Sequence, residues 1–143
     1  MLQLCYASQS TSTPDHLLQD LGNILQQARD FNVRHGISGV LYYADGYFFQ
    51  CLEGEEAVLQ QLLEKLRKDP RHKNVQLFLA CEVEHAHFSD WSMKYVGRNS
   101  VVKAFYQQLG FAKFHPLALN TTQLADFLLC LQAADEKSMQ NVA

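Results

Sequence analysis

This 143-residue chain lacks the features that would place it in several common protein classes. Its four cysteines stand far apart and never form a Cys-x-x-Cys pair, which argues against a metal ribbon and a disulfide scaffold. His85-x-His87 has no second well-spaced pair of ligands, so we assign no metal. Nowhere do about 18 apolar residues follow one another, and no basic segment precedes the apolar N-terminus. We therefore expect a cytoplasmic protein with reduced thiols and no membrane contact.

An excess of positive charge is also missing. The chain carries 12 Lys and Arg against 15 Asp and Glu, a formal net charge of −3, which argues against nucleic acid as a direct partner. A solvated helix end explains the local basic run from Lys65 to Lys73 better than nucleic acid does. With 48% hydrophobic and 19% charged residues, the composition is that of a globular chain with one core.

Hydrophobic periodicity predicts the order βαββαββ, followed by two more helices. The first helix is expected to have Thr13 as N-cap, Pro14 in its first turn and Gly36 as its stop. The Asp45-Gly46 pair predicts a tight hairpin between the second and third strands. The expected strands cover residues 2–8, 37–43, 47–52, 75–83 and 91–96, and the expected helices cover 14–32, 55–68, 101–109 and 121–131.

A split unit with two helices on one face of a sheet is the ferredoxin-like arrangement. Its other sheet face needs separate cover, which the two C-terminal amphipathic stripes can supply. We therefore predict an α+β protein: a ferredoxin-like βαββαββ sandwich over residues 1–97, and a C-terminal helical extension over residues 98–143 that packs on the sheet.

Gln50 interrupts a nearly all-apolar strand, Tyr47 to Leu52. A buried amide without partners costs about 1–3 kcal/mol, so either backbone carbonyls satisfy it or a polar group faces it. The side-chain amide of glutamine carries a hydrogen-bond donor and an acceptor at the same distance from the backbone, so exchanging the two can act as a hydrogen-bond switch. Tyr6 and Asn32 can converge with it between the two helices, although a buried tyrosine is often a core aromatic and a helix-end asparagine often a cap.

These residues belong to a longer series that resembles the BLUF domain, a blue-light sensor using FAD, and in particular its short stand-alone bacterial members. The matches occur in order from Leu4 to about Val96, over about two-thirds of the chain. They are Leu4-x-Tyr6-x-Ser8, Ala28-Arg29 with Asn32, Gly36 to Leu41, Phe48-x-Gln50-x-Leu52-Glu53-Gly54, Asp69 to His72, and Trp91-Ser92-Met93.

The resemblance implies that FAD lies between the two helices, with Asn32 at the N3 and O4 edge of its ring and Gln50 bridging Tyr6 to N5 and O4. It also implies that Ser8, Trp91 and Met93 shape the surroundings of this bridge. The other implied FAD contacts are Ile24, Ile37 and Phe48 against the ring, and Lys65, Arg71 and His72 toward the C2 carbonyl, ribityl chain or phosphates. Phe31 departs from the pattern, because many members place a polar residue there against the C2 carbonyl.

By the same resemblance, Tyr6 gives an electron and a proton to the light-excited flavin through Gln50, and the rearranged amide shifts the absorption band to the red. No substrate is consumed, so we expect a photoreceptor and not an enzyme. Trp91 and Met93, expected on one face of the last strand, then pass the change to the C-terminal helices. A downstream protein partner, bound in a light-dependent way, is expected to receive the signal, and homo-oligomerisation stays open.

Two alternatives remain at this point. An acylphosphatase-like enzyme also uses an arginine and an asparagine on a ferredoxin-like fold, but its phosphate cradle needs a glycine-rich loop, and residues 9–14 contain no glycine. A cofactor-free interaction module that kept the fold and lost the flavin is the other alternative, and Phe31 favours testing it.

Overall fold

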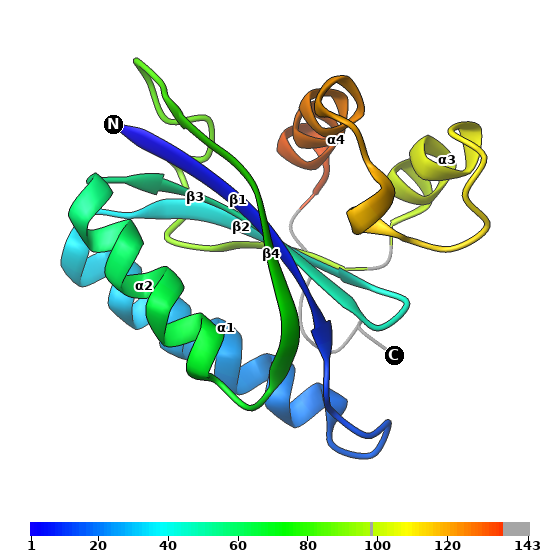
Figure 1. Cartoon of the computed structure of the whole chain (residues 1–143), viewed down its shortest axis with the longest axis horizontal. Helices are drawn as coiled ribbons and strands as arrows, with labels where there is room; N and C mark the ends of the chain where they lie inside the picture. Colours follow the sequence, from blue (N-terminus) through cyan, green and yellow to red (C-terminus); the bar gives the residue numbers. More distant parts are fainter. Residues whose placement is uncertain (98, 136–143) are drawn as a thin grey trace.

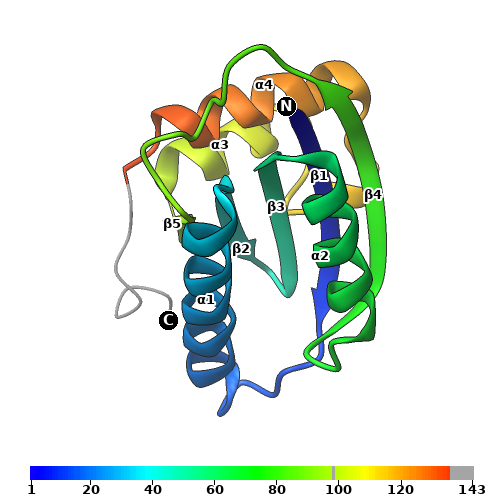
Figure 2. The ribbon, with the colours of Figure 1, turned by 90° about the vertical axis from the view of Figure 1, so that its left-hand side faces the viewer.

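The computed structural model describes residues 1–97 and 99–135, apart from the side chain at position 79. Five strands form one sheet in the order β4-β1-β3-β2-β5, with α1 and α2 side by side on one face and α3 and α4 on the other (Figures 1 and 2). This arrangement confirms the predicted α+β ferredoxin-like fold with two added helices. The elements are β1 Leu2–Ser10, α1 Leu17–His35, β2 Ser38–Ala44, β3 Tyr47–Gly54, α2 Glu56–Lys68, β4 His72–Glu82, β5 Lys94–Val96, α3 Ser100–Gln108, a 3-10 turn Pro116–Ala118 and α4 Thr121–Ala133.

The sheet is antiparallel except where β5 runs parallel to β2. Between β2 and β3, Asp45 has φ 53° and Gly46 has φ 86°, the left-handed conformation that a tight hairpin turn requires at both positions. The hairpin prediction is therefore confirmed. In the neighbouring β1–β3 pairing, Tyr6 lies directly opposite Gln50, so the register places these two side chains on the same face.

The predicted C-terminal end of α1 is confirmed, and its predicted N-terminal end is wrong. Gly36 ends α1 with φ 66°, as predicted. The expected N-cap at Thr13 is wrong, because the Thr13 hydroxyl pairs with Nδ1 of His16 at 2.9 Å and residues 14–16 form a turn instead of a first helical turn. The helix begins only at Leu17. In α4, Asn120 is the N-cap, with a reciprocal pair of bonds to Gln123.

The last strand is shorter than predicted, because it begins at Lys94 instead of residue 91. The chain bends at residues 92 and 93, so the alternation of an extended strand does not apply there. Met93 packs into the core beneath α1 and α2, whereas Trp91 packs against the core beneath α3 and α4. The prediction that these two side chains share a face is therefore wrong.

Alternation along the strands gives the protein two cores, one on each side of the sheet. On β1, Leu4 and Tyr6 point to the side of α1 and α2, called here the α1/α2 face, and Cys5 and Ala7 point to the side of α3 and α4, called the α3/α4 face. No helix in the described part of the chain is long and apolar enough to cross a membrane. The division into units at residue 97 stays a prediction.

Candidate functional site

A cavity of about 370 Å³ opens between α1, α2 and the sheet. Its wall is mostly apolar, with charged side chains toward α2 and the start of β4, which suits a planar organic ligand that carries a polar tail. The residues that line it are Ile24, Gln27, Ala28, Phe31, Gln50, Leu62, Lys65, Leu66, Lys68, Asp69, Arg71, His72 and Met93.

Gln50 lines this cavity, and Tyr6 lies directly opposite it on β1, outside the set of lining residues. Tyr6 is completely buried, and its hydroxyl has no hydrogen-bond partner among the described residues. Gln50 is 2% exposed and lines the cavity directly opposite Tyr6 across β1 and β3. Burial raises the pKa of Tyr6 well above its usual value, so the phenol is neutral at pH 7.

Asn32 lies near the end of α1, fully buried. Its Nδ2 donates to the carbonyl oxygen of Ser92, while its Oδ1 has no partner among the described residues. One turn earlier, Arg29 Nε donates to the carbonyl oxygen of Met93 at 3.1 Å. The last turns of α1 therefore hold the segment whose Met93 side chain lines the cavity, although Asn32 itself is outside the lining set.

Ser8 reaches the cavity through His72. The Ser8 hydroxyl and Nδ1 of His72 are 2.9 Å apart, and His72 lines the cavity. Nε2 of His72 has no hydrogen-bond partner in the described part of the chain, and the nearest carboxylate oxygen of Asp69 is 3.9 Å away. Burial lowers the pKa of His72, so the ring is neutral at pH 7 and leaves one nitrogen for a ligand.

The mouth of the cavity is charged. Arg71 donates to both carboxylate oxygens of Asp69, at 2.9 Å from Nε and 2.6 Å from Nη2, and from Nη2 to Oε1 of Gln27 at 2.8 Å. Burial raises the pKa of the Asp69 carboxyl, but the hydrogen bonds and charge of Arg71 outweigh it and lower the pKa overall. This bridge fixes the guanidinium at the rim, where it is about three-quarters buried.

Phe31 changes the character of the opposite rim. Its ring stacks on His35 with centroids 4.0 Å apart, and Nζ of Lys65 lies 5.0 Å above it. The position where the resemblance leads one to expect a polar side chain therefore presents an aromatic face with a cation over it.

Besides Tyr6, Ser8 and Asn32, three more expected residues lie outside the cavity wall: Ile37, Phe48 and Trp91. Ile37 and Phe48 are buried in the core of the α1/α2 face, and Phe48 packs its ring 5.0 Å from that of His72. Trp91 is on the α3/α4 face. Ile37 and Phe48 can thus support the lining residues from behind, whereas Trp91 is on the far side of the sheet from Gln50.

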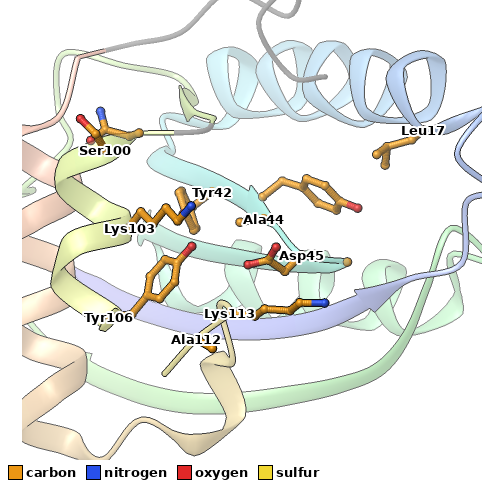
Figure 3. Close-up of a pocket in the computed structure, with 12 residues that line it drawn as sticks. Leu17, Tyr42, Ala44, Asp45, Ser100, Lys103, Tyr106, Ala112 and Lys113 are labelled. Carbon is orange, nitrogen blue, oxygen red and sulfur yellow. The ribbon is translucent and has the colours of Figure 1, made fainter. Parts of the chain in front are cut away.

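A second cavity, of about 690 Å³, lies between the β2–β3 turn and α3. Figure 3 shows Lys103 and Tyr106 from α3 and Asp45 from the turn around it. Two of its polar groups have partners: Asp45 accepts from the backbone N–H of Phe114 at 2.7 Å, and the Tyr106 hydroxyl is hydrogen-bonded to that of Tyr42. None of the expected site residues line this cavity, so it is not the candidate site.

Sequence reasoning gave no role to two buried charged residues, Glu53 and Lys94. The Glu53 side chain, 0% exposed, accepts from the backbone N–H groups of His87 and Phe88 at 2.8 Å each and from Gln3 Nε2 at 3.1 Å. Lys94 is 2% exposed. The sequence does indicate that these two residues are buried, because each stands in a mostly apolar strand, as Gln50 does.

Comparisons with known proteins agree with this geometry. The model of the BLUF family, described as sensors of blue-light using FAD, matches residues 1–94. The structure of BlsA in its ground state is 47% identical and superimposes with a TM-score of 0.92, covering 99% of this chain and 93% of that one. BlrB, a BLUF protein in its dark state, is 27% identical with a TM-score of 0.78, covering 92% of this chain and 95% of that one.

Curated relatives match over the same segment. The beta subunit of a photoactivated adenylate cyclase from Euglena longa is 36% identical over 91 residues, which are 63% of this chain and 10% of that protein. The chain thus spans about a tenth of the length of the curated relatives it matches most strongly. The shared segment is a light-sensing unit and not an enzyme.

Proposed function

Because the chain belongs to the BLUF family of blue-light sensors that use FAD, we propose that its photoreceptor response is carried by Gln50, in the wall of the cavity between α1 and α2, and by Tyr6, opposite it on β1. The observation that carries this proposal is the buried Tyr6 hydroxyl, which has no partner among the described residues and belongs to the residue directly opposite Gln50 in the β1–β3 pairing. An unpaired buried hydroxyl costs about 1–3 kcal/mol, so a ligand that completes its hydrogen bonds is favoured there.

The residues fit an FAD ring in three respects. The cavity lies between two helices with a mostly apolar lining, and its mouth carries cations for phosphates. The buried atoms Tyr6 OH, Asn32 Oδ1 and His72 Nε2 have no hydrogen-bond partner within residues 1–97 and 99–135. Isoalloxazine has donor and acceptor atoms along one edge, which such a set of protein atoms can pair. When bound, FAD supplies the absorption of blue light and an acceptor for an electron.

Tyr6 is the group that releases a proton and an electron in this proposal. Its raised pKa opposes loss of a proton alone, so the two leave together. The Gln50 amide would accept the proton at its oxygen and release another from its nitrogen to the bound flavin, which also takes the electron. This exchanges the donor and acceptor ends of the amide without any backbone movement. Ser8 and His72, joined at 2.9 Å, and Met93 in the cavity wall hold the surroundings of this pair.

The other assignments concern FAD binding. Asn32 Oδ1 is placed to accept from the ring edge, and Ile24 packs against the ring with Ile37 and Phe48 behind it. Lys65, Arg71 and His72 face the ribityl and phosphate side. Trp91 has no direct part here, because it packs on the α3/α4 face.

The output of the sensor is proposed to be a partner protein that binds the C-terminal extension in a light-dependent way. One groove, of about 300 Å³, lies between α4 and the loop after β4, and Leu129 beside it is 62% exposed. Glu53, on the same strand as Gln50, holds His87 and Phe88 at one wall of this groove. Self-association in one light state and a cytoplasmic location remain predictions.

The test is the visible spectrum of the purified protein before and after blue light. A yellow protein with flavin bands and a reversible red shift is the expected result. A colourless protein that binds no added FAD contradicts the proposal and favours the cofactor-free module. A flavin spectrum without any shift contradicts the proposed roles of Tyr6 and Gln50 while leaving FAD binding intact.

A further inference from the structure

Lys94, the first residue of β5, is a lysine buried inside the protein, with only 2% of its surface exposed. Its Nζ donates a hydrogen bond of 2.9 Å to the carbonyl oxygen of Gln132, in the last turn of α4. The same Nζ lies 4.3 Å from the centre of the Trp91 ring. The ammonium group of Lys94 on β5 therefore contacts both Trp91 and the last turn of α4.

Both partners suit a cation. The face of an indole ring attracts positive charge, and the last carbonyl groups of a helix form the negative end of its dipole. These contacts offset the cost of burying an ammonium group, which is several kcal/mol. Because apolar side chains of similar volume often replace buried ionic groups without loss of stability, the fold by itself does not require a lysine at this position.

Lys94 also stands between the cavity and α4. Met93, its neighbour, lines the cavity, while the Lys94 side chain reaches α4 on the other face of the sheet. From the cavity side, α1 holds the backbone through Arg29 to Met93 O and Asn32 to Ser92 O. β5 is three residues long and pairs with β2, so a small shift at residues 92–93 is carried directly into Lys94.

We propose that Lys94 is the positioning residue that transmits the light response from the cavity wall to α4. When hydrogen bonds around Gln50 rearrange and Met93 shifts, Trp91 and the Lys94 ammonium move as a pair. A buried ammonium group cannot lose its carbonyl partner without a large cost, so the last turn of α4 follows it. The proposal rests on the proposed photoreceptor function, because it needs a light-driven change at the cavity.

The experiment compares wild type with Lys94→Met, which keeps the length of the side chain and removes the charge. Both proteins are loaded with FAD, and amide hydrogen exchange is measured in the dark and under blue light. In wild type, exchange in the last turn of α4 is expected to differ between dark and light. In Lys94→Met, the red shift and the melting temperature are expected to be retained, and the light-dependent difference in α4 to be lost.

Two further variants separate transmission from general damage. Lys103→Met, at an exposed position on α3, is expected to keep both the red shift and the α4 difference. Lys94→Arg is expected to keep part of the α4 difference, because a guanidinium group also binds a ring face and a carbonyl oxygen. If Lys94→Met fails to fold, Lys94→Arg decides: an α4 difference kept at least in part supports the proposal, and a folded Lys94→Arg with the red shift but no α4 difference overturns it.

A light-dependent α4 difference that persists in folded Lys94→Met overturns the proposal. It is also overturned if wild type shows the red shift with no change in α4. Neither result affects the photoreceptor function, which fails separately if wild type shows no red shift at all.

Discussion

On the α1/α2 face of the sheet, four buried side-chain atoms have no hydrogen-bond partner among the described residues, whereas the buried polar groups of the α3/α4 face are paired. The unpaired atoms belong to Tyr6 and Tyr95 in the α1/α2 core, to His72 in the cavity wall and to Asn32, a buried residue of α1. Unpaired buried groups are rare in proteins because each is costly. The difference indicates that the α1/α2 face is completed by a ligand.

The α3/α4 face is instead built as an ordinary core. Phe127 touches the rings of Tyr42, Phe49, Phe105 and Phe114, with centroids 5.1–5.9 Å apart. Its buried Glu53 carboxylate accepts hydrogen bonds from two backbone N–H groups and from the side chain of Gln3. Perturbing the first face should therefore change the response to light, and perturbing the second should change stability and output.

The largest effect is expected at the Tyr6–Gln50 pair. Tyr6→Phe and Gln50→Leu should each fold and bind FAD, because the changes of volume are small, but should lose the light-induced red shift entirely. Difference spectra before and after blue light measure this. Tyr42→Phe removes a hydroxyl from the α3/α4 face and serves as the matched control that keeps the shift. A normal red shift in Gln50→Leu contradicts the mechanism.

On the other face, Glu53→Ala should lower the free energy of unfolding by about 3–5 kcal/mol, since it leaves the N–H groups of His87 and Phe88 without an acceptor. Urea titration of the FAD-loaded protein measures this loss. Glu56→Ala, at an exposed position in the first turn of α2, should change stability by less than about 1 kcal/mol. Equal stabilities of the two variants would show that the carboxylate does not hold the loop.

A moderate effect is expected for Asn32→Ala, which removes an unpaired oxygen beside the cavity. Loss of one hydrogen bond to FAD in a dry site should weaken FAD binding about tenfold or more. Equilibrium dialysis measures the change in affinity. Asn23→Ala, at an exposed position on the same helix, should leave affinity unchanged. If the two variants retain FAD equally, Asn32 does not belong to the binding set.

The smallest effect concerns pH and His72. Burial lowers its pKa below 6.5 in the folded protein, so the unfolded chain binds more protons as the pH falls through 6.5. This contribution to stability is therefore present above pH 6.5 and is lost progressively as the pH falls below that value toward the lowered pKa of His72 in the folded protein. Urea midpoints of wild type and His72→Gln at about pH 7 and about pH 5.5 should show a flatter pH dependence in the variant. Parallel curves would mean that His72 is freely protonated in the fold.

Much of the site could be predicted from the sequence because side chains alternate regularly between the two faces of an extended strand. Tyr6 and Gln50 were expected to meet, and the β1–β3 register places them opposite each other. The direction of Trp91 could not be anticipated, because alternation assumes an extended chain and residues 92–93 bend. The hydrogen bonds of Arg71 to Asp69 and Gln27 were not predicted either. From the sequence, Arg71 was expected to contact the ligand, and no partner for it within the protein was considered.

The sequence by itself determined the two faces of the sheet, the hairpin at Asp45-Gly46 and the stop at Gly36, because each depends on residues adjacent along the chain. Only the tertiary structure decided how buried charges are satisfied. The Glu53 carboxylate accepts from the backbone N–H groups of His87 and Phe88, which lie 34 and 35 residues further along the chain. The Lys94 ammonium group donates to the carbonyl oxygen of Gln132, which lies 38 residues further along. Such partners are chosen when the α3/α4 face closes over the sheet, because a charge leaves water only where packing brings a partner to it.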